Sequence, residues 1–282
     1  ARRGSRRTRT VQTRNSPRSR RGDFGPCKVV ILAGGFGTRL AEHTDDLPKP
    51  MVQIGGRPIL WHILKIYSHF GFNDFLIAAG YKSDVIKRFF LEYREQTSDL
   101  VLDFAADHIV RMNSTLEPWR IAIVDTGGDT MTGGRIRRLA PHLGDRTFLM
   151  TYGDGVANVD LQSLLKFHNQ HGKLATFTAV SRPETFGLPT FDGDRVTSFA
   201  EKPQRGAQWI NGGFFALNPR ILHYISDDAT SFEADSLSRL ARDGELMAFR
   251  HKGFWHPMDT LRDVRILNSL WARGDAKWKL WD

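Results

Sequence analysis

The stretch ILAGGFGTRLAEHTDDLPKP, residues 31–50, decides the fold of this chain. Residues 28–33 form an apolar run rich in β-branched side chains, and a glycine ends the run. Such a run is typical of a buried strand in a parallel sheet. Gly34, Gly35 and Gly37 leave the backbone free to take a positive φ and to approach a ligand closely. A glycine loop at the carboxyl end of a parallel strand offers free backbone N–H groups, so we expect this loop to bind an anion.

The charged residues after the loop indicate which anion it binds. Thr38 and Arg39 follow the last glycine, and Lys49 comes ten positions after Arg39. An arginine fork and a lysine point charge supply what a polyphosphate needs, which predicts a site for a nucleoside triphosphate. The loop is not a Walker motif, because GTR stands where Gly-Lys-Ser/Thr is required. It is not a dinucleotide fingerprint either, because Leu40 replaces the third glycine. The glycines alone would also fit a tight strand-to-helix turn with no ligand.

Predicted strands and helices alternate after the loop. Strands are predicted at residues 74–79, 101–105, 121–124, 147–150, 175–180, 190–191, 196–200 and 214–217. Helices are predicted at residues 58–71, 84–94 and 161–171. Two more are predicted: one begins at residue 132, and the last one in the chain ends at residue 271. This order predicts an α/β fold with a doubly wound, mostly parallel sheet. In such sheets the ligand crevice lies beyond the carboxyl ends of the strands. The shorter strands with intervening Gly and Pro after residue 171 predict a small additional lobe.

The charge of the chain is concentrated at its beginning. The formal net charge is +9, and nine arginines lie within the first 21 residues, which contain no acidic side chain. Basic and acidic side chains therefore balance in the rest of the chain, and nothing there indicates a nucleic-acid partner. Residues 1–24 are predicted to be a disordered Arg-rich tail. An arm that binds anionic polymers or membrane surfaces, or a transit peptide, is an alternative to the preferred interpretation, a solvated tail or translated upstream extension.

Cysteine content and hydropathy narrow the class of protein further. Cys27 is the single cysteine, so a disulfide framework is excluded and a reducing cytoplasm is expected. No apolar run approaches the roughly 20 residues that a membrane span needs, so we expect no membrane partner.

Two aspartates far apart in the sequence are candidate metal ligands. Asp154 lies between two glycines at the end of a predicted strand, and Asp259 follows a His-Pro pair. Two carboxylates, completed by water and phosphate oxygens, suit octahedral Mg²⁺. Each aspartate alone would also fit a turn or a helix cap. Lys202, between Glu201 and Pro203, would equally fit a surface ion pair.

Taken together, these motifs resemble those of the sugar-phosphate nucleotidyltransferases, also called sugar-nucleotide pyrophosphorylases. The likeness covers nearly the whole chain from Lys28 onward and is tightest to the branch that transfers a cytidylyl group to glucose 1-phosphate. The motifs that carry it, besides the glycine loop, are GYK at 80–82, EPW at 117–119, VDTG at 124–127, MTGGR at 131–135, YGDGV at 152–156, INGGFF at 210–215, GELMAF at 244–249 and PMDTLRD at 257–263. One departure is Leu47, where a second lysine is expected before Pro48.

The resemblance implies a Rossmann-like nucleotidyltransferase domain over residues 25–282, with a nucleotide-binding part at about 25–156 and a sugar-binding part at about 157–282. It implies the substrates CTP and glucose 1-phosphate, Mg²⁺ as cofactor, and CDP-glucose for dideoxysugar and surface-polysaccharide pathways as product. We also expect a cytoplasmic homo-oligomer.

The residue roles follow from this reaction. Arg39, Lys49 and Lys202 are the predicted catalytic residues, with the first two on the β- and γ-phosphates and Lys202 on the sugar phosphate. The predicted nucleotide-binding residues are Leu32, Ala33, Gly34, Gly35, Gly37, Thr38, Gly80, Thr132 and Arg135. Thr132 and Arg135 are expected on the cytosine side, because the glycine pair between them permits close approach to a base. The predicted substrate-binding residues are Glu201, Lys202, Asn211 and Gly212, with Glu201 and Asn211 on the sugar hydroxyls, and the predicted metal ligands are Asp154 and Asp259.

Two other interpretations stay open at this point. The same chemistry could use UTP, dTTP or another hexose 1-phosphate, because base choice depends on a few contacts. A catalytically silent regulatory or nucleotide-sensing homologue could also share the fold. Such a homologue is expected to have lost some of the charged residues, and all of them stand in this sequence.

Overall fold

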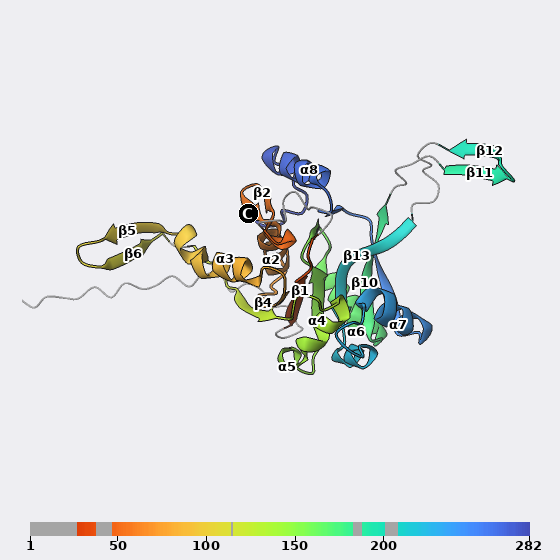
Figure 1. Cartoon of the computed structure of the whole chain (residues 1–282), viewed down its shortest axis with the longest axis horizontal. Coiled ribbons are helices and arrows are strands. Elements are labelled where there is room, and N and C mark those ends of the chain that lie inside the picture. The colour runs from red at the N-terminus through yellow and green to blue at the C-terminus, as the bar shows by residue number, and fades with distance from the viewer. Residues whose placement is uncertain (1–26, 38–46, 114, 183–187, 201–207) are drawn as a thin grey trace, which may run out of the picture.

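A computed structural model describes residues 27–37, 47–113, 115–182, 188–200 and 208–282, and its centre is a seven-stranded sheet (Figure 1). The strand order is β14-β10-β13-β8-β1-β4-β7. These strands are β1 (Lys28–Ala33), β4 (Asp74–Ala79), β7 (Arg120–Asp125), β8 (Phe148–Tyr152), β10 (Ala175–Arg182), β13 (Gln208–Leu217) and β14 (Leu246–His251). β8, β1, β4 and β7 run parallel to one another, whereas β13 is antiparallel to both β8 and β10, and β14 is parallel to β10. The predicted doubly wound, mostly parallel α/β fold is confirmed.

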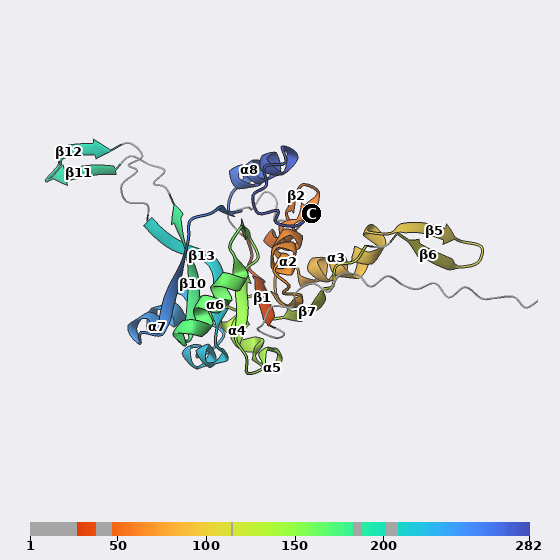
Figure 2. The same ribbon diagram turned by 180° about the vertical axis from the view of Figure 1, so that it is seen from behind.

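Helices cover both faces of the sheet because successive side chains of a strand point to opposite faces. In β1, Val29 and Ile31 belong to one buried cluster, and Val30 and Leu32 to the other. The first cluster includes α2 (Ile59–His69) and α6 (Leu161–His171), with α3 (Ser83–Gln96) and α8 (Leu261–Ala272) packed against it. The second includes α4 (Thr132–Arg138), α5 (Ala140–Leu143), η3 (Pro219–Tyr224), η4 (Phe232–Leu237) and α7 (Ser238–Arg242). Figure 2 shows the same layers from behind.

A buried histidine joins the C-terminal end of the chain to the first helix. His62 of α2 donates from Nε2 to the Ile54 carbonyl oxygen at 2.8 Å, in the short hairpin of β2 (Gln53–Ile54) and β3 (Arg57–Pro58). Its Nδ1 accepts from the indole Nε1 of Trp278 at 3.3 Å, and both side chains are fully buried. Burial lowers the pKa of His62 to about 4. The ring is therefore neutral, as its accepting nitrogen requires.

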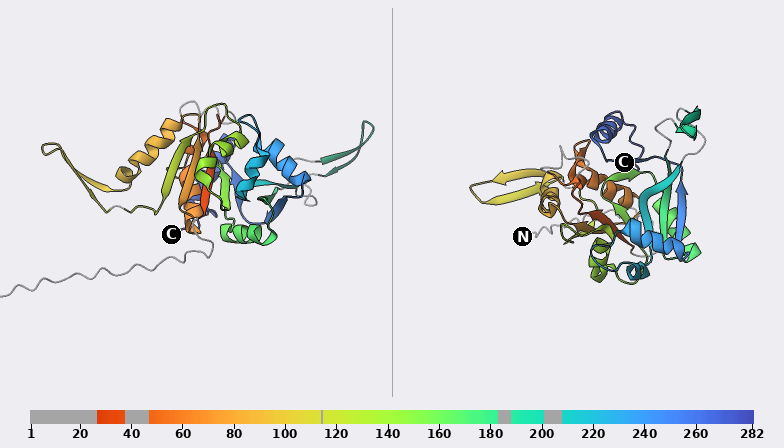
Figure 3. Two further views of the ribbon diagram at one scale, coloured as in Figure 1. Left: turned by 90° about the horizontal axis from the view of Figure 1, so that it is seen from below. Right: turned by 45° about the vertical axis from the view of Figure 1, so that its right-hand side comes forward.

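Two hairpins project from opposite ends of the molecule (Figures 1 and 3). One consists of β5 (Asp99–Asp103) and β6 (His108–Met112), and the other of β11 (Leu188–Asp192) and β12 (Arg195–Ala200). The predicted strand at 101–105 thus belongs to a separate two-stranded sheet and adds nothing to the central one. Its side chains are exposed on both faces, so burial does not hold it against the core.

Most other predicted elements agree with the structure to within a few residues, and β4 and α6 agree at both ends. The edge strand β14 was not predicted. Its residues are only half-buried, which weakens the apolar signal on which a strand prediction depends. Among the described residues, no helix is both long and apolar enough to cross a membrane.

Candidate active site

The glycine loop lies where the chain reverses direction across the sheet. From β1 the chain continues to β4 and β7 on one side, and then returns to the other side of β1 as β8. A crevice forms at such a reversal because the loops after the two neighbouring strands separate to opposite faces. A pocket of about 740 Å³ occupies this place. Of the predicted site residues, Leu32, Ala33, Gly34, Gly35, Gly37, Lys49, Thr132, Arg135, Asp154, Asn211, Gly212 and Asp259 line it.

The three loop glycines differ in what they contribute. Gly37 has the positive φ, at 67°, that favours glycine. Gly34 lies against Arg135, whose Nη1 would be 2.2 Å from a Cβ added there, while Gly35 is exposed to open space. Gly35 therefore offers its backbone most directly to a ligand. Thr38 and Arg39 lie outside the described residues.

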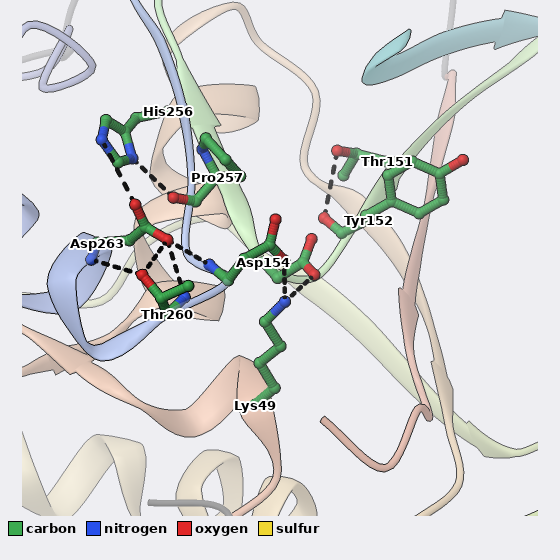
Figure 4. Close-up of polar contacts among 9 residues, drawn as sticks. Lys49, Thr151, Tyr152, Asp154, His256, Pro257, Thr260 and Asp263 are labelled. Carbon is green, nitrogen blue, oxygen red and sulfur yellow. Dashed lines mark hydrogen bonds and ion pairs between the residues drawn. The ribbon is translucent and has the colours of Figure 1, made fainter. Parts of the chain in front are cut away.

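Lys49 and the two predicted metal ligands meet in this pocket. Lys49 begins the short 3-10 helix η2 (Lys49–Met51) directly after Pro48. Its Nζ donates to Asp154 Oδ2 at 2.6 Å and to Asp259 Oδ1 at 2.7 Å (Figure 4). These partners lie 105 and 210 positions away in the sequence. One ammonium group thus joins three distant segments of the chain.

A small two-stranded sheet brings the two aspartates together. β9 (Gly155–Ala157) pairs antiparallel with β15 (Trp255–Pro257), and Pro257 lies opposite Gly155. The Met258 amide continues the ladder by donating to the Asp154 carbonyl oxygen at 2.7 Å. Asp154 and Asp259 flank this ladder at the same end, so their carboxylates face a common point.

Charge and burial make this point suitable for cations. The Lys49 side chain is 12% exposed, and those of Asp154 and Asp259 are 33% and 35% exposed. Burial lowers the pKa of Lys49, but the two carboxylates raise it by more, so its pKa lies above the usual value and the amine stays charged. The geometry shows that both carboxylates can engage a single cation between them, which fits the oxygen donors that a divalent ion prefers. The described residues contain no group of three or more metal-ligating side chains, so substrate and water oxygens would have to complete the coordination.

A helix cap holds Asp259 in place. Thr260 is the N-cap of α8, and its hydroxyl accepts from the Asp263 amide at 3.2 Å. In return, Asp263 Oδ2 accepts from the Thr260 amide at 2.8 Å and from the Asp259 amide at 3.1 Å (Figure 4). The capping box therefore fixes the backbone of a candidate metal ligand as well as the start of a helix.

Arg135 connects the loops around the pocket. Its Nη2 donates to the carbonyl oxygens of Gly34 and Gly128, both at 2.9 Å, and its Nη1 donates to the Gly127 carbonyl oxygen at 2.7 Å. Arg135 as a whole is 4% exposed, and burial lowers the pKa of its guanidinium. Gly80 does not line the pocket; a Cβ at Gly80 would lie 2.4 Å from Arg135 Nη1. The buried arginine thus holds the glycine loop against its neighbours.

The glycine pair before Arg135 has a different function from the one expected. A Cβ at Gly133 would lie 2.7 Å from the Thr230 carbonyl oxygen, and one at Gly134 would lie 2.6 Å from the Asp228 Cα. The pair therefore permits close packing of α4 on residues 228–230 of the same chain. Close approach to a base at these two glycines was the wrong reason for placing Thr132 and Arg135 beside cytosine.

The far wall of the pocket contains a polar group that the sequence did not indicate. Glu233 accepts from the hydroxyls of Tyr152 and Thr132, both at 2.6 Å. Asn211 Nδ2 donates to the Tyr152 hydroxyl oxygen at 3.3 Å, and Gly212 accepts from Trp255 Nε1 at 2.7 Å. Nothing local distinguishes Glu233 from the exposed Asp235 two residues on, so only the packing of η4 reveals it. Glu201 and Lys202 lie outside the described residues.

Comparisons with known proteins show the family to which this chain is similar. The family model described as Nucleotidyl transferase matches residues 28–272. The glucose-1-phosphate cytidylyltransferase of Salmonella typhi is 51% identical over 256 residues, which cover 90% of this chain and 100% of that protein. A mannose-1-phosphate guanyltransferase of Emericella nidulans is 30% identical over 84% of this chain and 62% of its own length. Among solved structures, HddC from Yersinia pseudotuberculosis has a TM-score of 0.65 at 24% identity, covering 87% of this chain and 99% of its own, which is a likeness of fold.

Proposed function

This chain belongs to the nucleotidyl transferase family, and from that premise we propose that it transfers the cytidylyl group of CTP to glucose 1-phosphate, giving CDP-glucose and pyrophosphate. The observation that carries the choice of substrates is the 51% identity to a glucose-1-phosphate cytidylyltransferase over the whole length of that relative. The convergence of Lys49, Asp154 and Asp259 in one pocket supports the chemistry.

The reaction needs no covalent intermediate on the protein. A phosphate oxygen of glucose 1-phosphate forms a bond to the α-phosphorus of CTP, and the bond from that phosphorus to the bridging oxygen of pyrophosphate breaks. The contribution of the chain is to align the two anions and to neutralise charge that develops between them. This role of Lys49 is supported by its charged amine, which lies at the same pocket as the glycine loop.

A divalent ion suits the two aspartates, and we take it to be Mg²⁺. Asp154 and Asp259 would hold it, and when bound it supplies positive charge to the phosphate oxygens. Because the two carboxylates are about one-third exposed, the substrate phosphates and water can reach an ion held there.

The remaining roles rest on the sequence motifs. Thr38 binds the nucleotide, Arg39 neutralises the β- and γ-phosphates together with Lys49, and Lys202 takes the sugar phosphate. Glu201, Asn211 and Gly212 bind the sugar, and the last two line the same pocket as Lys49. Residues 25–156 then bind the nucleotide and residues 157–282 bind the sugar phosphate. The substrates and the buried free thiol of Cys27 fit a cytoplasmic enzyme.

The chain is proposed to work as a homo-oligomer. Leu100, Val101, Leu102, Ile109, Val110 and Met112 on the β5–β6 hairpin are each 39–49% exposed, and Phe104 is 90% exposed. A hairpin with apolar side chains on both faces is marginal alone and gains stability when a second copy of the chain covers it.

One experiment tests the proposed activity. The purified chain is incubated with Mg²⁺, glucose 1-phosphate and each of CTP, UTP, dTTP and GTP, and pyrophosphate release is measured. We expect CTP to be at least about tenfold faster than the others, since hydrogen bonds to a base discriminate by that order. A preference for another nucleotide would keep the chemistry and change the substrate. No release with any of them would favour a catalytically silent homologue.

A further inference from the structure

Three segments of the chain meet at the carboxylate of Glu233 on the pocket wall, and a fourth joins them through Tyr152. Its Oε1 accepts from the Tyr152 hydroxyl at the end of β8, at 2.6 Å. Its Oε2 accepts from the Thr132 hydroxyl at the start of α4, at 2.6 Å, and from Ser231 Oγ at 3.2 Å. The chain of contacts continues from Tyr152 to Asn211 of β13.

The backbone places Glu233 there by an irregular helix. η4 is a π-helix over Phe232–Leu237, in which Glu233 is the second residue. The Phe232 amide donates to the Thr132 hydroxyl oxygen at 2.9 Å, which fixes the helix start against α4. Single-turn π-helices are rare and often occur at functional sites. The irregular turn directs Glu233 into the pocket lining, whereas Asp235 stays exposed.

The contacts decide which atoms of this wall can still accept or donate a hydrogen bond. Because the Tyr152 hydroxyl gives its only hydrogen to Glu233, its oxygen can act toward a ligand only as an acceptor. An ionised carboxylate has about four acceptor positions, and three of those of Glu233 are taken by hydroxyl groups. The wall therefore offers a ligand acceptors from Glu233 and Tyr152, beside donors from the amide of Asn211. Figure 4 shows the Tyr152 ring directed away from the Lys49 ammonium.

Such a wall suits a group with several neutral hydroxyls. A ligand phosphate has no hydrogen to donate at neutral pH. A ligand carboxylate would be repelled by the negative charge of Glu233. A hexose, by contrast, both donates and accepts at each hydroxyl.

We propose that Glu233 is a specificity-determining residue that accepts a hydrogen bond from a hydroxyl of the hexose and holds Tyr152 in the orientation that completes this sugar subsite. The proposal rests on the proposed function, because the hexose phosphate is the acceptor substrate of that reaction. The proposal adds Glu233 of η4 to the sugar subsite. None of the sequence motifs included this residue.

The test compares Glu233→Gln and Tyr152→Phe with the unchanged chain in steady-state kinetics with both substrates. Glu233→Gln keeps the size of the side chain but turns one acceptor oxygen into a donor. We expect the KM for glucose 1-phosphate to rise about tenfold or more in each variant, while the KM for CTP changes less than about threefold. The double variant should be no worse than the poorer single variant, because both changes break the same contact.

Asp235→Asn is the matched control. Asp235 lies on the same helix and accepts from the Ser231 amide at 2.8 Å, but it does not line the pocket. If Glu233 served only to build η4, Asp235→Asn would lower the melting temperature together with Glu233→Gln and raise both KM values. We expect Asp235→Asn to leave the KM for glucose 1-phosphate within about twofold of the unchanged chain.

The outcomes separate this proposal from the activity itself. An unchanged chain without cytidylyltransferase activity would overturn the proposed function and this inference with it. An active unchanged chain in which Glu233→Gln raises neither KM, or raises both equally, would overturn only the assignment of Glu233. A panel of glucose 1-phosphate analogues that each lack one hydroxyl then locates the contact. The analogue without the recognised hydroxyl should bind the unchanged chain and Glu233→Gln with similar KM values.

Discussion

The ammonium group of Lys49 lies within 2.7 Å of one oxygen from each of two carboxylates, and the side chain is 12% exposed. This single side chain bonds both Asp154 and Asp259 and lies at the pocket where the phosphates are proposed to bind. Burial of the amine is tolerated because both partners are hydrogen-bonded to it. At the residue scale, charge balance in the site depends on Lys49.

Lys49→Ala is expected to lower kcat by a factor of about 100 or more, because it removes a cation that neutralises transition-state charge. The measurement is pyrophosphate release at saturating CTP and glucose 1-phosphate. Lys166→Ala, an exposed position on α6, is the matched control and should keep the normal rate. A near-normal rate for Lys49→Ala would refute its assigned role.

His62 is expected to make stability depend on pH. Its pKa is lowered to about 4 in the folded chain and is about 6.5 when unfolded, so the unfolded chain takes up the proton first as pH falls. The stabilising contribution is complete above pH 6.5 and declines toward pH 4. Between pH 7 and pH 5 the loss from this residue is about 2 kcal/mol. His62→Gln should be less stable than the unchanged chain at pH 7 but should lose about 2 kcal/mol less between pH 7 and pH 5 in urea denaturation. Equal losses would contradict the argument.

At the scale of elements, two devices position Asp259. The β9–β15 ladder brings it beside Asp154, and the capping box of α8 holds its amide through Asp263. Both are short elements, and their contribution to overall stability is small compared with that of the seven-stranded sheet. Their main effect is on the geometry of the site.

Asp263→Ala is expected to raise the Mg²⁺ concentration for half-maximal rate by about tenfold, because it releases the backbone of a candidate metal ligand. Asp160→Ala is the control, since Asp160 caps α6 by accepting from the Ser163 amide at 2.9 Å, away from the pocket lining. Loss of either cap should cost about 1 kcal/mol of stability. The Mg²⁺ concentration for half-maximal rate should rise only for Asp263→Ala. Equal values in the two variants would contradict the positioning role of Asp263.

At the scale of the whole molecule, the exposed β5–β6 hairpin is the feature that a single chain leaves unexplained. The hairpin extends from the end of α3 (Figure 1), and none of its side chains belongs to the two buried clusters. An exposed apolar surface of this kind marks a contact with another chain. The proposed homo-oligomer would bury it.

The double variant Leu102→Asp/Phe104→Asp is expected to give a smaller species than the unchanged chain in light scattering coupled to size exclusion. Both side chains are exposed in the single chain, at 49% and 90%, so the fold itself should lose less than about 1 kcal/mol. Circular dichroism checks that the fold is kept. If the unchanged chain and the variant have the same mass, the hairpin is not the oligomer contact.

Local signals in the sequence were sufficient for most elements. The run Val29–Ala33 and the glycines after it predicted β1 and its loop, because burial on both faces requires apolar residues throughout. The helix predicted at 161–171 agrees with α6 at both ends, where Asp160 is the N-cap and Gly172 the C-cap. The strand at 101–105 was assigned without its partner, because pairing to β6 in a separate hairpin depends on no local signal. Glu233 was missed for the same reason: its partners Thr132 and Tyr152 lie 101 and 81 positions away.

The sequence by itself determined which chemical groups this protein has: the glycine loop, Lys49 and the two aspartates, each next to a recognisable strand end or turn. These groups can be recognised from their neighbours in the sequence, because the conformation of a glycine and the burial of a strand depend on a few consecutive residues. Only the tertiary structure decided that Lys49 bonds both aspartates, that Arg135 holds backbone loops, and that Glu233 joins the pocket wall. Those contacts depend on sheet order and helix packing, which bring together side chains that no local pattern relates.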